Sequence, residues 1–234
     1  MQEIYERLPL ILNGLGVTVS VALLSLAVAL SLGLLGAAAN LSKHAFLRAI
    51  GVTYTSLVRG IPELVLLLIM FYGVQMLLNR VMEGLGFDIV SLDAFTIGVL
   101  VIGFIYGAYM AESFRGAWLS IPKGQIEAGQ AIGMSPMILM RRIIWPQLMR
   151  YALPGIGNNW QVLLKATALI SIVGLQDVVW VATSQGRSTQ MPFTFMVLVL
   201  LLYLGLNELS RQVIRYAEKR FSIGQVSFDK AQGM

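Results

Sequence analysis

The chain has 234 residues, of which 57% are hydrophobic and 12% are charged, and its formal net charge is +5. A soluble domain has about 25% charged residues, so this composition excludes an ordinary soluble domain and predicts an integral membrane protein. The absence of cysteine excludes disulfides, thiolate catalysis and cysteine-ligated metals, and a positive-inside bias explains the charge better than nucleic-acid binding does.

Five segments are apolar enough to cross a bilayer as helices, each of which needs about 20 residues. Their approximate ranges are 14–40, 57–79, 94–118, 151–176 and 190–211. The apolar runs are continuous and lack the alternation of barrel strands, so we predict an all-α integral membrane protein with five transmembrane helices. Residues 1–220 are expected to form a single transmembrane domain, and residues 221–234 a short cytoplasmic tail.

The distribution of Lys and Arg predicts the orientation of these helices. Basic residues gather in the loops before the second and fourth spans and in the C-terminal tail, whereas acidic residues are more frequent on the opposite side. The positive-inside rule then places the N-terminus outside and the C-terminus in the cytoplasm. Within the third span, Gly103 and Gly107 form a G-x-x-x-G pattern, which predicts close helix packing.

A polar segment, 119–150, separates the third and fourth spans. Pro122 suits the first turn of a helix, and Ser135-Pro136 is expected to end that helix and begin a second. Pro146 is expected to break the second helix before the fourth span. Apolar and polar residues alternate here as an interfacial helix requires, so a simple elbow between two spans is the alternative to a functional segment.

The spacing of residues in this segment resembles the E-A-A-x3-G-x9-I-x-L-P loop of binding-protein-dependent ABC importer permeases. The matching residues are Glu127, Ala128, Gly129, Gly133, Ile143 and Pro146, with Gly129 and Trp145 in place of the usual Ala and Leu. The resemblance implies the fold of a type I ABC importer permease. It also implies that 119–150 is a coupling segment, which docks on a partner ATPase and transmits the motion of that ATPase to the membrane helices.

Further motifs extend the likeness over nearly the whole chain. Arg59-Gly60-Ile61-Pro62, Tyr109-x-Ala111-Glu112-x-x-Arg115-Gly116 and Gly155-Ile156-Gly157-Asn158-Asn159-Trp160-Gln161 resemble the polar amino-acid permeases, and in particular their Q-type histidine/lysine/arginine/ornithine group. That resemblance implies import of basic amino acids. Glutamine, glutamate or opines such as octopine and nopaline are alternatives, and an ATP-independent channel or carrier is disfavoured by the absence of an inverted repeat.

The same resemblance implies the partners and the location. These are a sister M-type permease subunit, an ATPase dimer, a periplasmic solute-binding protein and the bacterial inner membrane. The chain has no G-x-x-x-x-G-K-[ST] motif with which to cradle phosphates, so ATP and Mg²⁺ are expected on the partner ATPase. We therefore expect no cofactor, metal site or catalytic residue in this chain, and no enzyme activity of its own.

Ionisable groups inside membrane spans are costly and are therefore candidates for substrate contact. The predicted substrate-binding residues are Glu112, Glu63, Thr167, Asn158 and Ser171. Two alternatives remain open for the carboxylates, because Glu63 has Arg59 four residues away and Glu112 has Arg115 three residues away. Lys165 is expected to be a buried structural partner of a carboxylate.

Overall fold

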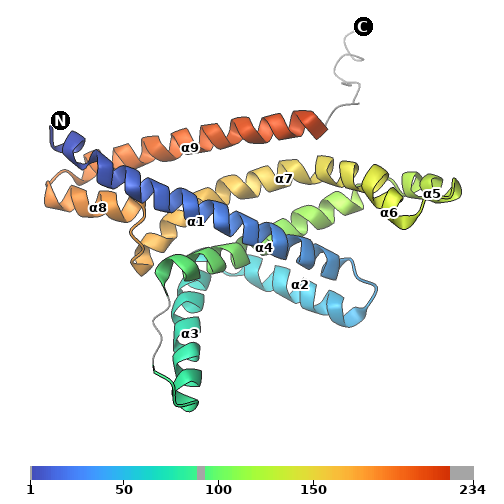
Figure 1. Cartoon of the computed structure of the whole chain (residues 1–234), viewed down its shortest axis with the longest axis horizontal. Coiled ribbons are helices and arrows are strands. Elements are labelled where there is room, and N and C mark those ends of the chain that lie inside the picture. Colours follow the sequence, from blue (N-terminus) through green and yellow to red (C-terminus); the bar gives the residue numbers. More distant parts are fainter. Residues whose placement is uncertain (1, 89–92, 222–234) are drawn as a thin grey trace, which may run out of the picture.

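The structure is a computed structural model that describes residues 2–88 and 93–221 (Figure 1). The described residues are organised as helices without a β-strand, which confirms the predicted all-α class. The elements are α1 (Gln2–Asn40), α2 (Ala45–Gly60), α3 (Glu63–Gly84), α4 (Ala94–Leu119), α5 (Lys123–Ala131), α6 (Pro136–Leu139), the π-helix η1 (Met140–Ile144), α7 (Trp145–Ala166), the 3₁₀-helix η2 (Thr167–Val173), α8 (Val178–Ser188) and α9 (Pro192–Phe221). All but the first residue of the predicted tail, 221–234, lies outside the described residues.

The centre of the bundle is the pair α1 and α4, which cross at close range (Figure 1). A Cβ atom added to Gly103 would lie 2.5 Å from Cγ1 of Val28, and one added to Gly107 would lie 2.8 Å from Cβ of Leu32. Both distances are too short for real side chains, so the two helices approach this closely only because glycine stands at the contact. The predicted packing role of the G-x-x-x-G pattern is confirmed.

The second predicted span, 57–79, is wrong at its start, because the chain breaks there into two helices. α2 ends at Gly60, Ile61 adopts extended backbone angles (φ −106°, ψ 140°), and α3 begins at Glu63. A proline disfavours the helical conformation in the residue before it, so Pro62 forces this break. Sequence reasoning missed α2, which packs on α1 and α4. Glu63 consequently stands in the first turn of α3.

The fourth predicted span, 151–176, overlaps a longer helical run, Pro136–Val173, which consists of α6, η1, α7 and η2. Its last three predicted residues, 174–176, lie beyond the end of that run. The expectation that Pro146 breaks this run is wrong, since Pro146 is the second residue of α7. In η1 the Trp145 N–H bonds to the Met140 carbonyl, which is the i→i+5 pattern of a π-helix. The wider π turn makes room for the proline ring, which in a regular helix would clash with the carbonyl four residues earlier.

Within the described residues, four helices are long and apolar enough to cross a membrane: Tyr5–Asn40, Glu63–Gly84, Ala94–Leu119 and Pro192–Phe221. The run Pro136–Val173 and helix Val178–Ser188, bent by 53°, add a fifth span if they are counted together. The fold is therefore compatible with four or five spans, where the sequence predicted five.

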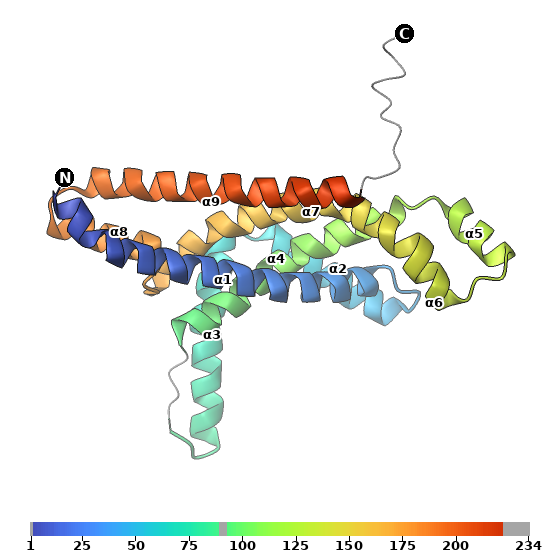
Figure 2. The same ribbon diagram turned by 45° about the horizontal axis from the view of Figure 1, so that its top comes forward.

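The two ends of the bundle differ in character (Figure 2). One end carries α5 and α6, and the other carries the start of α1 together with α8. At that second end the Val178 N–H bonds to Oγ1 of Thr18 at 3.1 Å, and Nη1 of Arg7 donates to Oγ of Ser188 at 3.0 Å. Asp177 caps α8 by accepting the Trp180 N–H at 2.8 Å. The bonds made by Thr18 and Arg7 attach α8 to α1.

Candidate functional site

The predicted coupling segment forms a helical hairpin at one end of the bundle (Figure 2). Its first helix, α5, begins after Pro122, and the second, α6, begins after Ser135, both as the sequence predicted. The side chains of Glu127 and Ala128 are exposed on α5. An exposed polar helix of this kind is a surface on which another protein can dock. The α5–α6 hairpin lies at the opposite end of the bundle from α8 (Figure 2).

Two glycines of the hairpin have different structural roles. A Cβ atom on Gly129 would lie 2.5 Å from Cδ1 of Leu139 and 2.9 Å from Cδ1 of Ile143, so Gly129 lets α5 pack against the second helix. Gly133 has a positive φ of 76° and no atom within 4 Å of a built Cβ. The bonds from Met134 N–H to Gly129 O and from Gly133 N–H to Gln130 O form a Schellman cap, which requires the left-handed conformation.

A groove of about 420 Å³ lies between α5 and the η1–α7 stretch that follows α6. It brings together four of the six predicted coupling residues, while Glu127 and Gly133 do not line it. Its lining is Gln125, Ala128, Gly129, Ile132, Arg142, Ile143, Pro146 and Gln147. Nε2 of Gln147 donates to Oε1 of Gln125 at 2.5 Å and so links α7 to α5 across the groove.

Glu112 is the centre of an ionic cluster that joins the ends of three helices. Its carboxylate accepts from Nη2 of Arg115 at 2.8 Å and lies 3.7 Å from Nη1 of Arg59. Nδ2 of Asn40 donates to it at 3.4 Å. The anticipated pairing of Glu112 with Arg115 is therefore present, and a second guanidinium adds to it. The cluster carries one negative and two positive charges, so a cationic ligand gains little by approaching Glu112.

Glu63 has a different environment, because no cation pairs with it among the residues described. Its Oε2 accepts a hydrogen bond from Oη of Tyr106, a fully buried residue of α4, at 3.0 Å. Arg59 lies over the ring of Tyr109, 5.5 Å from the centroid, and its nearest carboxylate is that of Glu112. The anticipated pairing of Glu63 with Arg59 is absent, since the break at Pro62 separates their helices. Glu63 thus presents an uncompensated carboxylate.

The predicted polar residues of the fourth span do not converge on one site. Oγ1 of Thr167 donates to the carbonyl of Leu164 at 2.7 Å in a buried position, whereas Asn158 is exposed. Ser171 lines a cavity beside α8. Lys165 is exposed and forms no ion pair within the described part of the chain, so its expected role as a buried partner of a carboxylate is wrong.

Comparison with known proteins decides the family. The family model described as binding-protein-dependent transport system inner membrane component matches residues 29–223. The chain belongs to this family.

Relatives of this transport component cover nearly the whole chain. It is 49% identical to the histidine/lysine/arginine/ornithine transport system permease protein HisQ of Salmonella typhimurium, over 92% of this chain and 94% of that protein. It is 42% identical to the octopine transport system permease protein OccQ of Rhizobium radiobacter, over 89% of each. A crystal structure of an amino acid ABC transporter with histidines superposes with a TM-score of 0.79 at 27% identity, covering 93% of this chain and 96% of that one.

Sequence reasoning missed three notable residues of this transport component. Tyr106 is the hydrogen-bond donor to Glu63, and only the fold brings it there from 43 positions away. Asp177 is buried, with one carboxylate oxygen that has no hydrogen-bond partner in the described structure. Arg187 lies on α8, a helix too short to be recognised as a span. Asp177 and Arg187 could have been noticed in the sequence, because both are charged and flank a short apolar segment: Asp177 stands just before α8 and Arg187 near its end.

Proposed function

We propose that this chain is the Q-type transmembrane permease subunit of an ATP-driven importer of basic amino acids. The observation that carries the proposal is the 49% identity to HisQ over 92% of the chain. The exposed α5–α6 hairpin, placed at one end of the membrane bundle, supports it. The subunit performs no covalent chemistry: it alternates between inward- and outward-facing states while a separate ATPase binds and hydrolyses ATP with Mg²⁺.

The proposed assembly contains a sister M-type permease subunit, two copies of the ATPase and a periplasmic solute-binding protein. In it, the α5–α6 hairpin docks on the ATPase in the cytoplasm, with Glu127 and Ala128 on the exposed face of α5 and Gly133 as the cap that ends α5. The N-terminus and α8 then lie on the periplasmic side of the bacterial inner membrane. This orientation agrees with the positive-inside rule and with the opposite ends that the hairpin and α8 occupy in Figure 2.

For the substrate, we assign Glu63 the main role in meeting a cationic side chain. A carboxylate held in place by one buried tyrosine, without a cation beside it, favours a positive ligand. Glu112 has a secondary role, because Arg59 and Arg115 already neutralise it. The hydroxyl groups of Thr167 and Ser171 and the amide of Asn158 are proposed hydrogen-bonding groups along the fourth helix.

The experiment is uptake by the complete complex reconstituted in liposomes, with its binding protein outside and ATP on the ATPase side. We expect uptake of labelled arginine that ornithine, lysine and histidine inhibit by competition. Inactivating the partner ATPase is expected to abolish it. Uptake that persists without ATP hydrolysis would refute the ATP-driven mechanism. If octopine inhibits arginine uptake more strongly than ornithine, lysine and histidine do, the substrate is an opine, as the name of the OccQ relative suggests, and the ATP-driven mechanism still stands.

A further inference from the structure

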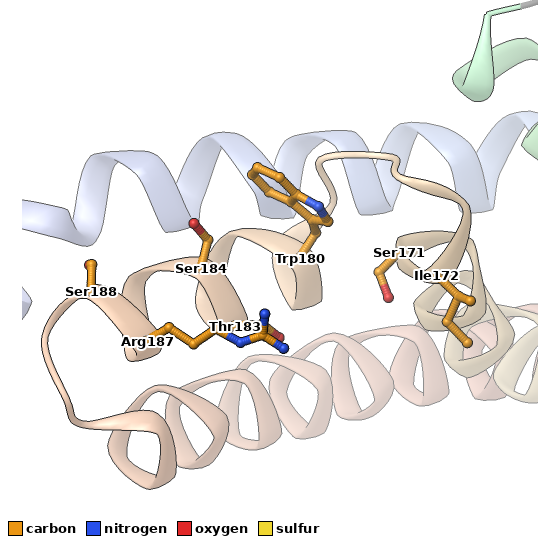
Figure 3. Close-up of a pocket in the computed structure, with 7 residues that line it drawn as sticks. All are labelled: Ser171, Ile172, Trp180, Thr183, Ser184, Arg187 and Ser188. Carbon is orange, nitrogen blue, oxygen red and sulfur yellow. The ribbon is translucent and has the colours of Figure 1, made fainter.

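A cavity of about 630 Å³, lined mainly by polar residues, opens between α8 and the 3₁₀-helix η2 (Figure 3). Its volume lies within the range of roughly 300–1,000 Å³ that small-molecule sites occupy. The lining includes Ser171, Trp180, Thr183, Ser184 and Arg187. The cavity lies at the end of the bundle opposite to the α5–α6 hairpin, and neither Glu63 nor Glu112 lines it.

The cavity offers an unpaired cation. Within residues 2–88 and 93–221, the side chain of Arg187 forms no ion pair and no hydrogen bond, and Figure 3 shows it running along α8 toward Thr183. A second guanidinium, that of Arg7, is fixed nearby through Oγ of Ser188. No acidic residue is in the lining, since Asp177 is buried under the start of α8 as its cap. The free charge of Arg187 therefore suits a carboxylate, which a guanidinium binds with two parallel hydrogen bonds.

The hydroxyl groups of the cavity have the opposite preference. Oγ of Ser171 donates its hydrogen to the carbonyl of Ala168 at 2.6 Å, and Oγ1 of Thr183 donates to that of Val179 at 2.7 Å. A hydroxyl has a single hydrogen to donate, so these two oxygens can now only accept from a ligand. Acceptors of this kind suit an ammonium group, which has three N–H donors and no acceptor.

The third element of the cavity is the partly exposed indole of Trp180, 37% of whose surface is accessible. The face of a tryptophan ring attracts a cation positioned over it, and tryptophan does so better than the other aromatic residues. The cavity therefore combines groups for a carboxylate, an ammonium and a cationic side chain, which are the three charged parts of a basic α-amino acid.

We propose that this cavity is a second amino-acid site on the outer side of the permease. Arg187 binds the α-carboxylate, the oxygens of Ser171 and Thr183 accept from the α-ammonium, and Trp180 faces the cationic side chain. The proposal rests on the function proposed above. It places a stopping point for the substrate between its release from the binding protein and its arrival at Glu63.

The test follows Trp180 itself in the complete permease–ATPase complex, labelled with 5-fluorotryptophan and studied in detergent without binding protein. The ¹⁹F resonance that is lost in Trp180→Phe identifies this residue. Titration with arginine is expected to shift the Trp180 resonance. Arginine should bind about tenfold or more tightly than argininamide, which lacks the carboxylate. Arg187→Gln should abolish this difference and Arg187→Lys should restore part of it. Arg80→Gln, which removes an exposed cation from α3, is the matched control and should change nothing.

Three results would overturn the proposal. The first is a resonance that does not respond to arginine, and the second is an unchanged preference for arginine in Arg187→Gln. The third comes from a separate titration with unliganded binding protein: a resonance that responds to that protein but not to arginine would identify the carboxylate as a side chain of the binding protein. Arginine uptake by the wild-type complex is measured in parallel. Normal uptake with a silent Trp180 refutes the outer site alone, whereas absent uptake of any amino acid refutes the proposed function.

Discussion

The different surroundings of Glu63 and Glu112 lead to opposite expectations for the same substitution. Glu63→Gln removes the charge but keeps an oxygen that accepts from Oη of Tyr106, so the local structure should persist. Transport of arginine, which is always positive, should then fall more than transport of histidine measured at about pH 8.5, where histidine is neutral. Glu112→Gln instead leaves Arg59 and Arg115 without their anion. We expect it to reduce transport of both substrates equally.

The magnitudes follow from the contacts. A carboxylate and a cation 4 Å apart gain about 4 kcal/mol at an effective dielectric constant of ~20, before desolvation. If desolvation leaves about 1.4 kcal/mol of this gain, Glu63→Gln weakens arginine transport roughly tenfold. The partners of Glu112 are 39% and 44% exposed, so solvent screens both pairs and each contributes about 0.2–1 kcal/mol. Glu112→Gln should therefore lower the stability of the complex by about 1 kcal/mol.

The assay is the initial rate of uptake of both amino acids at equal expression and equal ATPase activity, together with thermal unfolding of the purified complex. Glu83→Gln is the matched control, since Glu83 is an exposed carboxylate on the same helix as Glu63. Equal losses of arginine and histidine transport in Glu63→Gln would refute the reasoning. A loss of arginine transport alone in Glu112→Gln, with unchanged thermal stability of the complex, would refute it as well.

Three further predictions concern orientation, the hairpin and a helix cap. A cysteine at Glu83 should react with a membrane-impermeant reagent in intact cells and one at Gln125 should not; the reverse pattern would invert the topology. The Gly133→Asp variant should insert into the membrane normally but lose ATPase association or transport. The Gly133→Asn side chain is neutral, equally sized and tolerates a positive φ, so that variant should keep most of both. Equal behaviour of the two variants would exclude an effect of charge. Asp93 accepts the Thr96 N–H at 3.0 Å, which lowers the pKa of Asp93 below its usual 3.8. The stabilisation by the Asp93 cap is therefore present at neutral pH and disappears as the pH falls through that lowered pKa. Asp93→Ala should lower the stability by about 1 kcal/mol in thermal unfolding at pH 7, and by less in acid. Asp93→Ser, which caps with an uncharged hydroxyl, should show no such pH dependence.

Hydropathy and motif spacing predicted much of the architecture. Continuous apolar runs revealed the long helices, and the spacing from Glu127 to Pro146 located the hairpin. Both signals are local, because an apolar run or a short motif is complete within its own segment. Even so, an average over about 20 residues hides a single proline, and for this reason the break at Pro62 and the short helix α2 were missed.

The partners of the charged residues were harder to predict. The sequence neighbours of Glu63 suggested Arg59, but the fold gives it Tyr106 and gives Arg59 to Glu112. Such choices depend on how α2, α3 and α4 pack, which no spacing along one helix reveals. The cavity beside α8 was missed for the same reason, since Ser171 and Arg187 belong to different helices that meet only in the folded chain.

The π turn at Met140–Ile144 fixes the rotation of the α5–α6 hairpin about the axis of the long helical run. From Pro136 to Ala166 the elements α6, η1 and α7 follow one another without a break over about 45 Å at 1.5 Å per residue, so a change in winding at η1 rotates α6 relative to α7. The turn holds one residue more than a regular helical turn, and each residue of an α-helix advances the direction of its side chain by about 100°. Deleting one residue there would leave the segments on both sides helical but would rotate the hairpin about the helix axis to a different direction. A single additional residue thus sets the direction in which the α5–α6 hairpin points away from α7.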